Sequence, residues 1–312
     1  MQPLVISPRE VKLSTRTEIS VRRLIPHARL RRVGAWVFLD HFGPTPQVDG
    51  MKVQRHPHAG LQTVTWLFEG EVEHRDSLGS RQLIRPGQLN LMTAGRAVAH
   101  SEVSLGREAS GARPTSLHAV QLWLALPDSV RNSAPAFQHV EQAREFRIDG
   151  AAGRVFIGEF AGLRSPAVVH SPIAGVELRV TGRTWLPLRP DWQYALLVAE
   201  GSAIVEAVEL ATNQLAYLEA RDRTGVWIDV PAGQTALLVL LGFGLWAAKG
   251  AVALGLFDPT ANGFWGQAGN AQRLTQTVLM DVTTITNIGI LCGALWVSAK
   301  TPADSKPLST QQ

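Results

Sequence analysis

The sequence predicts an all-β protein of two tandem barrels, because short β-type segments separated by turn residues fill both halves of the chain. The run LQTVTWLF (61–68) is rich in β-branched and aromatic residues and ends at the turn signal Glu69-Gly70. No helical period of useful length interrupts residues 37–127. Many short strands punctuated by glycine and proline are typical of a barrel or a sandwich.

In the first half, strands are expected at residues 61–68, 71–76, 81–84, 89–93, 97–103 and 117–126. Pro86-Gly87 separates two of them, because proline removes a ladder donor and glycine supplies the turn. The stretch 128–147 is polar and carries Ser, Asn, Pro and Gln, so we expect a linker with one short helix at 140–145.

A second all-β pattern follows, with strands expected at residues 153–160, 176–180, 195–198, 203–207, 214–218, 225–230 and 236–241. Glu200-Gly201 repeats the Glu69-Gly70 turn, and the two similar halves indicate an internal repeat. We therefore expect one domain at 1–130, a second at 131–245 and an atypical extension at 246–312.

The bulk composition excludes several classes of protein. Of the 312 residues, 45% are hydrophobic and 18% charged, which is typical of a folded chain. The net charge of +4 is not gathered into a Lys/Arg run, so there is no direct nucleic-acid-binding motif. The single cysteine, Cys292, excludes an intrachain disulfide. Because residues 1–23 lack the apolar core of a signal peptide, we expect a cytoplasmic protein.

Four residues form two pairs that suit a metal ion. His56 and His58 stand at i and i+2, as do His100 and Glu102, and in a strand such pairs point to one side. Two pairs on neighbouring strands of a small barrel would converge in its interior. Three imidazole nitrogens and one carboxylate oxygen suit Fe, and also Mn, Ni, Cu or Zn.

Neither pair is decisive by itself, because histidines in strands often only form hydrogen bonds. Two pairs within one all-β pattern make a ligand set the better interpretation. Gln62 follows His58 by four positions, but an amide is a poor ligand for a divalent transition metal. We expect Gln62 either beside the ligands or in packing.

The longest motif is HPHAGLQTVTWLFEGEVEHRDSLGS (56–80), followed by MTAGRAVAHSEVS (92–104). With LDHFGP (39–44) and QLWLALP (121–127), these segments closely resemble the pirin family, over residues 1–245. The resemblance implies two cupin (jelly-roll) β-barrels, with one iron ion in the N-terminal barrel. The family's three histidines and one glutamate carry over onto His56, His58, His100 and Glu102.

The resemblance leaves two functions open. As an enzyme, the protein would be an Fe(II)-dependent dioxygenase that uses O₂ to open the ring of a quercetin-like flavonol. Glu102 would then be a ligand and also a catalytic base for the substrate hydroxyl. The alternative is a non-enzymatic, iron-dependent redox-sensing or regulatory protein with the same site. In either case we expect a monomer with one metal ion per chain. A vestigial cupin is disfavoured because the ligand set is complete.

Other polar residues in these motifs have plainer interpretations. His74 is expected to be a solvated or hydrogen-bonded strand residue rather than a ligand, and Trp66 to pack in the core. Asp40 and His41 are expected to order a loop, with pocket lining as a second role. Arg96 fits an anionic substrate and a structural salt bridge equally well.

The internal repeat allows the second barrel to be checked for ligands. Aligning the Gly201 turn with Gly70, and Gly233 with Gly95, places the counterparts of the first-barrel positions at Pro187, Arg189, Gln193, Leu238 and Leu240. No metal ligand survives among them, so we expect the second barrel to be metal-free.

The pirin-like pattern stops after residue 242. The runs FGLWAAKGAVALGLF (243–257) and VTTITNIGILCGALWVSA (282–299) are apolar, and each is near the lower length limit for a membrane span. Two interpretations stay open: buried helices of a soluble protein, or a hairpin through which residues 243–299 contact a membrane.

Overall fold

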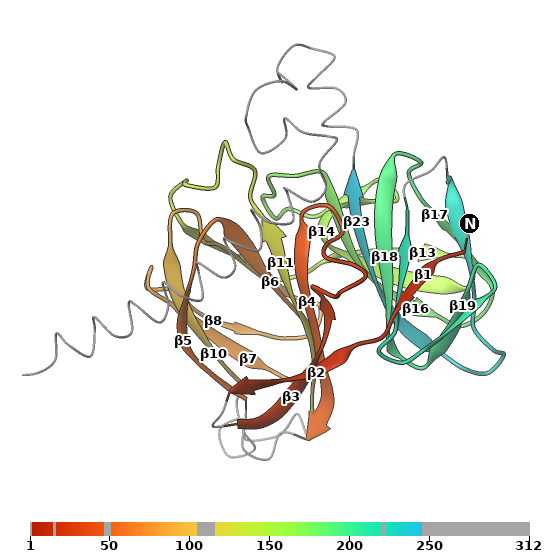
Figure 1. The fold of residues 1–312 in the computed structure, drawn as a ribbon, viewed down its shortest axis with the longest axis horizontal. Coiled ribbons are helices and arrows are strands. Elements are labelled where there is room, and N and C mark those ends of the chain that lie inside the picture. Colours follow the sequence, from red (N-terminus) through yellow and green to blue (C-terminus); the bar gives the residue numbers. More distant parts are fainter. Residues whose placement is uncertain (1, 15–16, 47–50, 105–115, 220–222, 245–312) are drawn as a thin grey trace, which may run out of the picture. The chain divides into compact units, whose positions relative to one another are not determined.

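The computed structural model describes residues 2–14, 17–46, 51–104, 116–219 and 223–244. The chain divides into two compact units, Met1–Gln267 and Ala268–Gln312, and every described residue lies in the first. These residues form 23 strands and no helix, which confirms the predicted all-β class (Figure 1). The strands expected at 81–84 and 89–93 have the predicted bounds.

The first barrel consists of a seven-stranded sheet, β12-β9-β6-β11-β4-β3-β2, and a four-stranded sheet, β5-β10-β7-β8. Its strands are β2 (Arg9–Ser14), β3 (Thr17–Ile25), β4 (Trp36–Pro46), β5 (Lys52–His58), β6 (Leu61–Glu69), β7 (Val72–Asp76), β8 (Arg81–Ile84), β9 (Leu89–Thr93), β10 (Val98–Ser104), β11 (Ser116–Ala125) and β12 (Ala136–Val140).

The second barrel repeats this plan with an eight-stranded sheet, β1-β21-β18-β23-β16-β14-β13 with β15 on β14, and a four-stranded sheet, β17-β22-β19-β20. Its strands are β1 (Leu4–Ile6), β13 (Arg144–Ile148), β14 (Ala151–Phe160), β15 (Leu163–Arg164), β16 (Ile173–Val180), β17 (Thr184–Pro187), β18 (Trp192–Glu200), β19 (Ser202–Val205), β20 (Val208–Ala211), β21 (Leu215–Leu218), β22 (Gly225–Asp229) and β23 (Ala236–Gly244).

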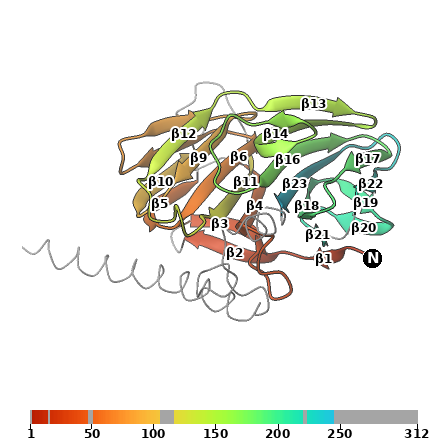
Figure 2. The ribbon, with the colours of Figure 1, turned by 90° about the horizontal axis from the view of Figure 1, so that it is seen from above.

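Two strands belong to the sheet of the other half of the chain. The N-terminal strand β1 pairs with β21 of the second barrel, and β12 pairs with β9 of the first (Figure 2). The boundary expected at 130/131 is therefore crossed by pairing in both directions.

The short helix expected at 140–145 is wrong. Ala136–Val140 and Arg144–Ile148 are strands that lie at the edges of the two large sheets. An edge strand is paired on one side only and exposes much of its length, so its composition is polar and resembles that of a linker.

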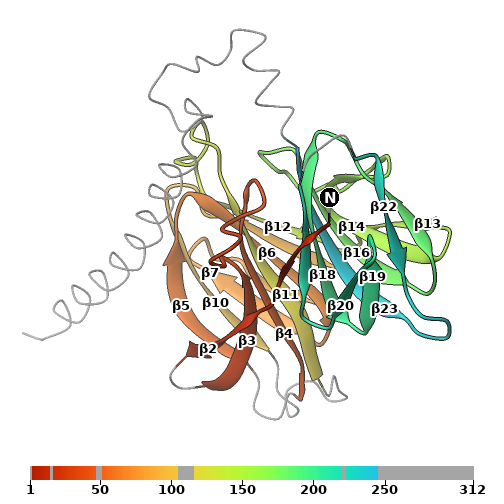
Figure 3. The ribbon, with the colours of Figure 1, turned by 45° about the vertical axis from the view of Figure 1, so that its right-hand side comes forward.

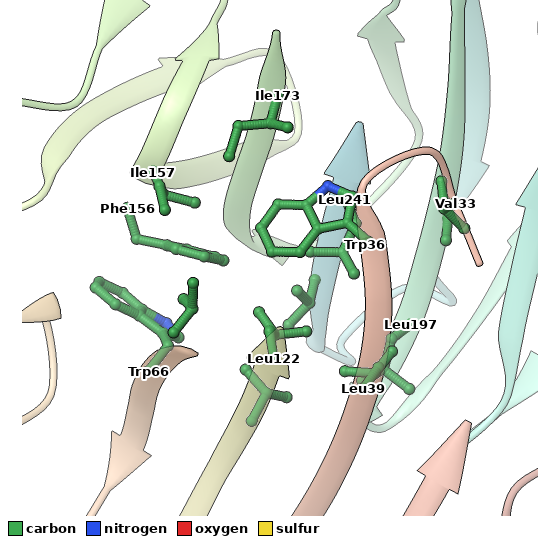
Figure 4. Close-up of a cluster of buried hydrophobic side chains, with 14 of the residues drawn as sticks. Val33, Trp36, Leu39, Trp66, Leu122, Phe156, Ile157, Ile173, Leu197 and Leu241 are labelled. Atoms are coloured by element: carbon green, nitrogen blue, oxygen red, sulfur yellow. The ribbon is translucent and has the colours of Figure 1, made fainter. Parts of the chain in front are cut away.

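The faces of β6, β11 and β4 that point away from the first barrel pack against the second barrel. Trp66 of β6 stacks on Phe156 of β14 at 4.8 Å between ring centroids, and Figure 4 shows the two rings side by side. Both residues are fully buried in one apolar cluster that includes Leu122 and Leu241. Trp66 Nε1 also donates to Glu177 Oε2 at 2.9 Å. The core role predicted for Trp66 is confirmed, and truncating such a residue typically costs about 3–5 kcal/mol.

The two barrel interiors differ in chemistry. The interior of the second barrel is a single apolar cluster that contains Leu238 and Leu240. In the first barrel the apolar residues form two smaller clusters, one around Leu67 and one around Met92. The first interior also holds the buried polar side chains described below.

A chain of side-chain hydrogen bonds crosses the joint between the barrels. His41 Nδ1 lies 2.7 Å from Asn213 Oδ1 of the second barrel, and His41 Nε2 lies 2.8 Å from His118 Nε2. The amide oxygen only accepts, so His41 donates from Nδ1 and accepts at Nε2 from His118. Burial lowers the pKa of His41 to about 3 and that of His118 to about 4, and both rings are neutral near pH 7.

This pair predicts acid lability. Below pH 6.5 these histidines become protonated in the unfolded chain, whereas in the folded chain His118 is not protonated until about pH 4. The free energy of unfolding should therefore fall as pH drops from 6.5 to 4, by up to about 1.4 kcal/mol per pH unit for each histidine. His118→Gln keeps a donor for His41 and should give a shallower slope in urea titrations. His170→Gln, at an exposed histidine, should keep the wild-type slope. An unchanged slope in His118→Gln would contradict the assignment.

Candidate metal centre

Strand register brings the two predicted ligand pairs together. In the antiparallel pair β5–β10, His100 lies opposite His56, and Val98 lies opposite His58. Residues opposite each other point to the same face, here the barrel interior. The ring centroids of His56 and His58 lie 4.5 and 5.0 Å from that of His100. Figure 3 shows β5 and β10 next to each other at the left, in the first barrel.

The potential ligand atoms fall into two overlapping groups. One atom from each of His56, His58 and His100 lies within 4.8 Å of the others, and the same holds for His74, His100 and Glu102. The structure thus gathers all four predicted ligands around His100, and it adds His74.

Hydrogen bonds leave selected nitrogens free for a metal. His56 Nδ1 donates to the Gln54 carbonyl at 2.8 Å, so its Nε2 keeps the lone pair. His100 Nε2 is buried and has no hydrogen-bond partner in the described part of the chain. A buried nitrogen without a partner is costly unless something else satisfies it, and a metal ion does so.

Glu102 is buried, with 6% of its surface exposed. The hydroxyl of Thr65 donates to Glu102 Oε1 at 2.9 Å, and the same hydroxyl lies 3.1 Å from Gln121 Oε1. The second carboxylate oxygen makes no hydrogen bond to a described residue, so it is the oxygen available to a cation.

Burial keeps His58 and His100 neutral. Desolvation, with His56 and His100 nearby, lowers the pKa of His58 well below 6.5. Desolvation and the neighbouring His56 and His74 lower the pKa of His100 to about 2. Neutral imidazoles offer the lone pairs that metal ligation requires, so no proton has to leave these rings first.

Known proteins resemble this chain over most of its described residues. A family model described as Pirin matches residues 18–124. A Caulobacter vibrioides "Pirin-like protein" is 36% identical over 230 residues, which cover 71% of this chain and 77% of that protein. The chain belongs to the pirin family. A Pseudomonas aeruginosa protein named "Putative quercetin 2,3-dioxygenase" is 42% identical over 225 residues, 71% of this chain and 69% of the relative.

Solved structures are similar to this chain in fold. A crystal structure of quercetin 2,3-dioxygenase from Acinetobacter baumannii has 38% sequence identity and a TM-score of 0.71. The match covers 78% of this chain and 79% of that one. The cupin barrels expected from the sequence are thereby confirmed.

His74 is more constrained in this pirin than a solvated strand residue would be. Only 2% of its surface is exposed, and its ring lies flat on Phe137 at 4.5 Å between centroids. Its Nε2 lies 3.2 Å from Asp76 Oδ2, and its Nδ1 lies 3.4 Å from His100 Nδ1. It is hydrogen-bonded, as the sequence analysis expected, but inside the metal centre.

An aromatic wall that sequence reasoning missed borders the ligands. Trp123 meets the His58 ring edge-on at 4.9 Å and stacks on Phe38 at 4.0 Å. Arg23 covers Phe38 at 4.4 Å and binds both carboxylate oxygens of Asp40 at 2.7 and 2.8 Å. Because side chains alternate along a strand, Trp123 lies on the opposite face of β11 from Leu122, but only the fold shows what that face contacts.

The loop role expected for Asp40 and His41 is wrong, because both lie within strand β4. Asp40 anchors Arg23 behind the aromatic wall, whereas His41 points into the joint between the barrels. Arg96 is exposed, and both interpretations of it stay predictions.

Gln62 faces away from the metal centre. Gln62 lies on the same face of β6 as Trp66. Thr65 lies on the other face, which points into the barrel. The Gln62 amide donates to Thr93 Oγ1 at 2.9 Å and to the carbonyl of Val168 in the second barrel at 3.2 Å. Of the two roles expected for Gln62, the structure supports packing at the barrel joint.

The second barrel has different side chains at the corresponding positions. Pro187 and Arg189 are exposed, and Arg189 lies over the ring of Trp192. Gln193 accepts a hydrogen bond from the Tyr217 hydroxyl at 3.1 Å. In the described residues both candidate ligand groups lie in the first barrel. A metal-free second barrel stays a prediction.

The expected extension at 246–312 lies outside the described residues, as does most of the segment 243–299. Within the described part of the chain, no helix has the length and apolarity needed to cross a bilayer. Membrane contact of the extension and the cytoplasmic location stay predictions.

Gln62→Glu tests the packing role. The change replaces an amide donor with a carboxylate that faces the Val168 carbonyl, and it buries a charge, so it should lower the free energy of unfolding by about 1–3 kcal/mol. Metal affinity should stay unchanged, because the side chain points out of the barrel. The control Gln193→Glu keeps the acceptor for Tyr217 and should cost less. Urea unfolding and metal titration on both variants test this role. Altered metal affinity with intact stability would refute it.

Proposed function

We propose that this pirin is an Fe(II)-dependent dioxygenase that opens the ring of a quercetin-like flavonol, with one metal ion in the first barrel. The observation that carries the proposal is the cluster around His100. Its Nε2 has no partner among the described residues, and one of its ring nitrogens lies within 4.8 Å of ligand atoms of His56 and His58. The dioxygenase names of the relatives support the substrate class.

The donor set fits a divalent transition metal. It combines neutral imidazoles with one carboxylate, which suits Fe(II) and also Mn, Ni, Cu or Zn. His56, His58, His100 and Glu102 would hold the ion. Bound there, Fe(II) would supply redox chemistry toward O₂ and a Lewis acid for a substrate oxygen.

The surrounding residues fit an aromatic substrate. Trp123 lies beside His58 with one face stacked on Phe38, and its other face offers a flat apolar surface on which a flavonol ring system can stack. Glu102 is the one carboxylate in the predicted ligand set, and it is placed to accept the proton of a substrate hydroxyl. Thr65 holds Oε1 of Glu102 and so sets the direction of the other oxygen.

The metal stoichiometry follows directly from the proposal. Apo protein loaded anaerobically with Fe(II) and desalted should retain one ion per chain by elemental analysis. His56→Ala and His100→Ala should each lose most of the metal, because each removes a bond that no neighbour can replace. His170→Ala, an exposed histidine of the second barrel, should load like the wild type. Two ions per chain, or none, would contradict the site.

Activity is tested by oxygen uptake. Iron-loaded protein with quercetin should consume O₂ well above the background of the metal-free protein. Glu102→Gln should lose most of the uptake, because an amide cannot take the hydroxyl proton, and its metal content should be measured in parallel. Full metal loading with uptake at background would favour the non-enzymatic, redox-sensing alternative. Light scattering on the same sample tests the expected monomer.

A further inference from the structure

We propose that Asp76 and His74 form a positioning pair that holds His100 in the tautomer and orientation needed to bind the metal. The inference rests on the proposed metal site and adds two residues outside the predicted ligand set. Two successive hydrogen bonds link Asp76 Oδ2 to His74 and His74 to Nδ1 of His100. The other ring nitrogen of His100 is the buried Nε2, which has no partner among the described residues.

Strand pairing creates this arrangement. In the antiparallel pair β7–β10, Asp76 lies opposite His100, and His74 lies opposite Glu102. All four side chains therefore lie on the same face of two adjacent strands, and His74 lies diagonal to His100. Such diagonal neighbours on a sheet lie within reach of long or aromatic side chains.

The direction of each proton follows from the anchored carboxylate. Asp76 Oδ1 accepts from the backbone N–H groups of Leu78 and Ser80, both at 2.9 Å, which fixes the carboxylate plane. Its Oδ2 only accepts, so His74 must donate from Nε2.

When its ring carries only this one proton, His74 keeps a lone pair on Nδ1 and accepts there from His100 Nδ1 across 3.4 Å, a long hydrogen bond. His100 consequently keeps its own lone pair on Nε2. The chain of hydrogen bonds thus selects the nitrogen that a metal would bind.

His74 is itself held in place. Phe137 of β12 covers one face of its ring, and the ring planes differ by 18°. Both ring nitrogens of His74 have a partner, whereas Nε2 of His100 has none among the described residues. This distinguishes a positioning role from direct ligation, although His74 also shares a 4.8 Å group with His100 and Glu102.

A carboxylate behind a ligand histidine raises its basicity, and loss of such a partner typically weakens metal binding about 10–100-fold. Two variants separate the contributions. His74→Gln removes the ring. Asp76→Asn keeps the size of the side chain. The backbone N–H groups of Leu78 and Ser80 would hydrogen-bond to the amide oxygen, so the amide nitrogen would face His74. His74 would then carry its proton on Nδ1, facing the proton of His100.

The experiment uses the full-length apo protein titrated with Co(II) against a competing chelator. Both variants should bind Co(II) about 10–100-fold more weakly than the wild type. X-ray absorption should show the same number of histidine ligands in all three proteins. In the NMR spectrum, the Co(II)-shifted ring N–H signal of His100 should be lost or exchange rapidly in both variants, while that of His56, held by Gln54, persists. His170→Gln should match the wild type in every measurement.

Three results would overturn the assignment: unchanged affinity in both variants, a His100 signal that persists in Asp76→Asn, or one fewer histidine ligand in His74→Gln, which would make His74 a direct ligand. Circular dichroism melts identify a variant that fails to fold, and the size-matched Asp76→Asn then carries the test. A wild-type protein that binds no Co(II), Fe(II) or Ni(II) would instead defeat the proposed function itself.

Discussion

The alternation of side chains along β6 and β11 is the constraint on which both the candidate metal centre and the barrel joint depend. Thr65 and Gln121 lie opposite each other in register, and both reach the neighbourhood of Glu102 inside the first barrel. Their chain neighbours Trp66 and Val120 are also opposite each other, and they point to the other face, where they pack on the second barrel. A slip of one residue would exchange the two sets and destroy both features at once.

The two barrels contribute unequally to stability and to chemistry. The second interior and the joint between the barrels are filled by large apolar clusters, whose burial is worth about 25 cal/mol per Å². The first interior instead accommodates histidines and a carboxylate, groups that are costly to bury unless they are paired or bound. The joint and the second barrel therefore brace a site that cannot stabilise itself by packing alone. Because its ligands lie on paired strands, the ladders hold them more rigidly than loops would.

Local patterns in the sequence predicted many of the strands from residue 61 onward, and both ligand pairs. His56 and His58, like His100 and Glu102, are two residues apart, so their common direction follows from strand geometry without knowledge of the partner strand. The edge strand at 136–140 was mistaken for part of a linker because edge strands lack the apolar alternation of central ones. Gln62 stayed ambiguous until the fold showed which face of β6 points into the barrel.

The sequence by itself determined the all-β class, the internal repeat and the two ligand pairs, since each depends on residues close together in the chain. Only the tertiary structure decided that Asp76 and His74 line up behind His100, that Trp123 borders the ligands, and that β1 crosses to the second barrel. These features depend on the register between distant strands. That register is set by the packing of whole sheets, and no short stretch of sequence encodes it.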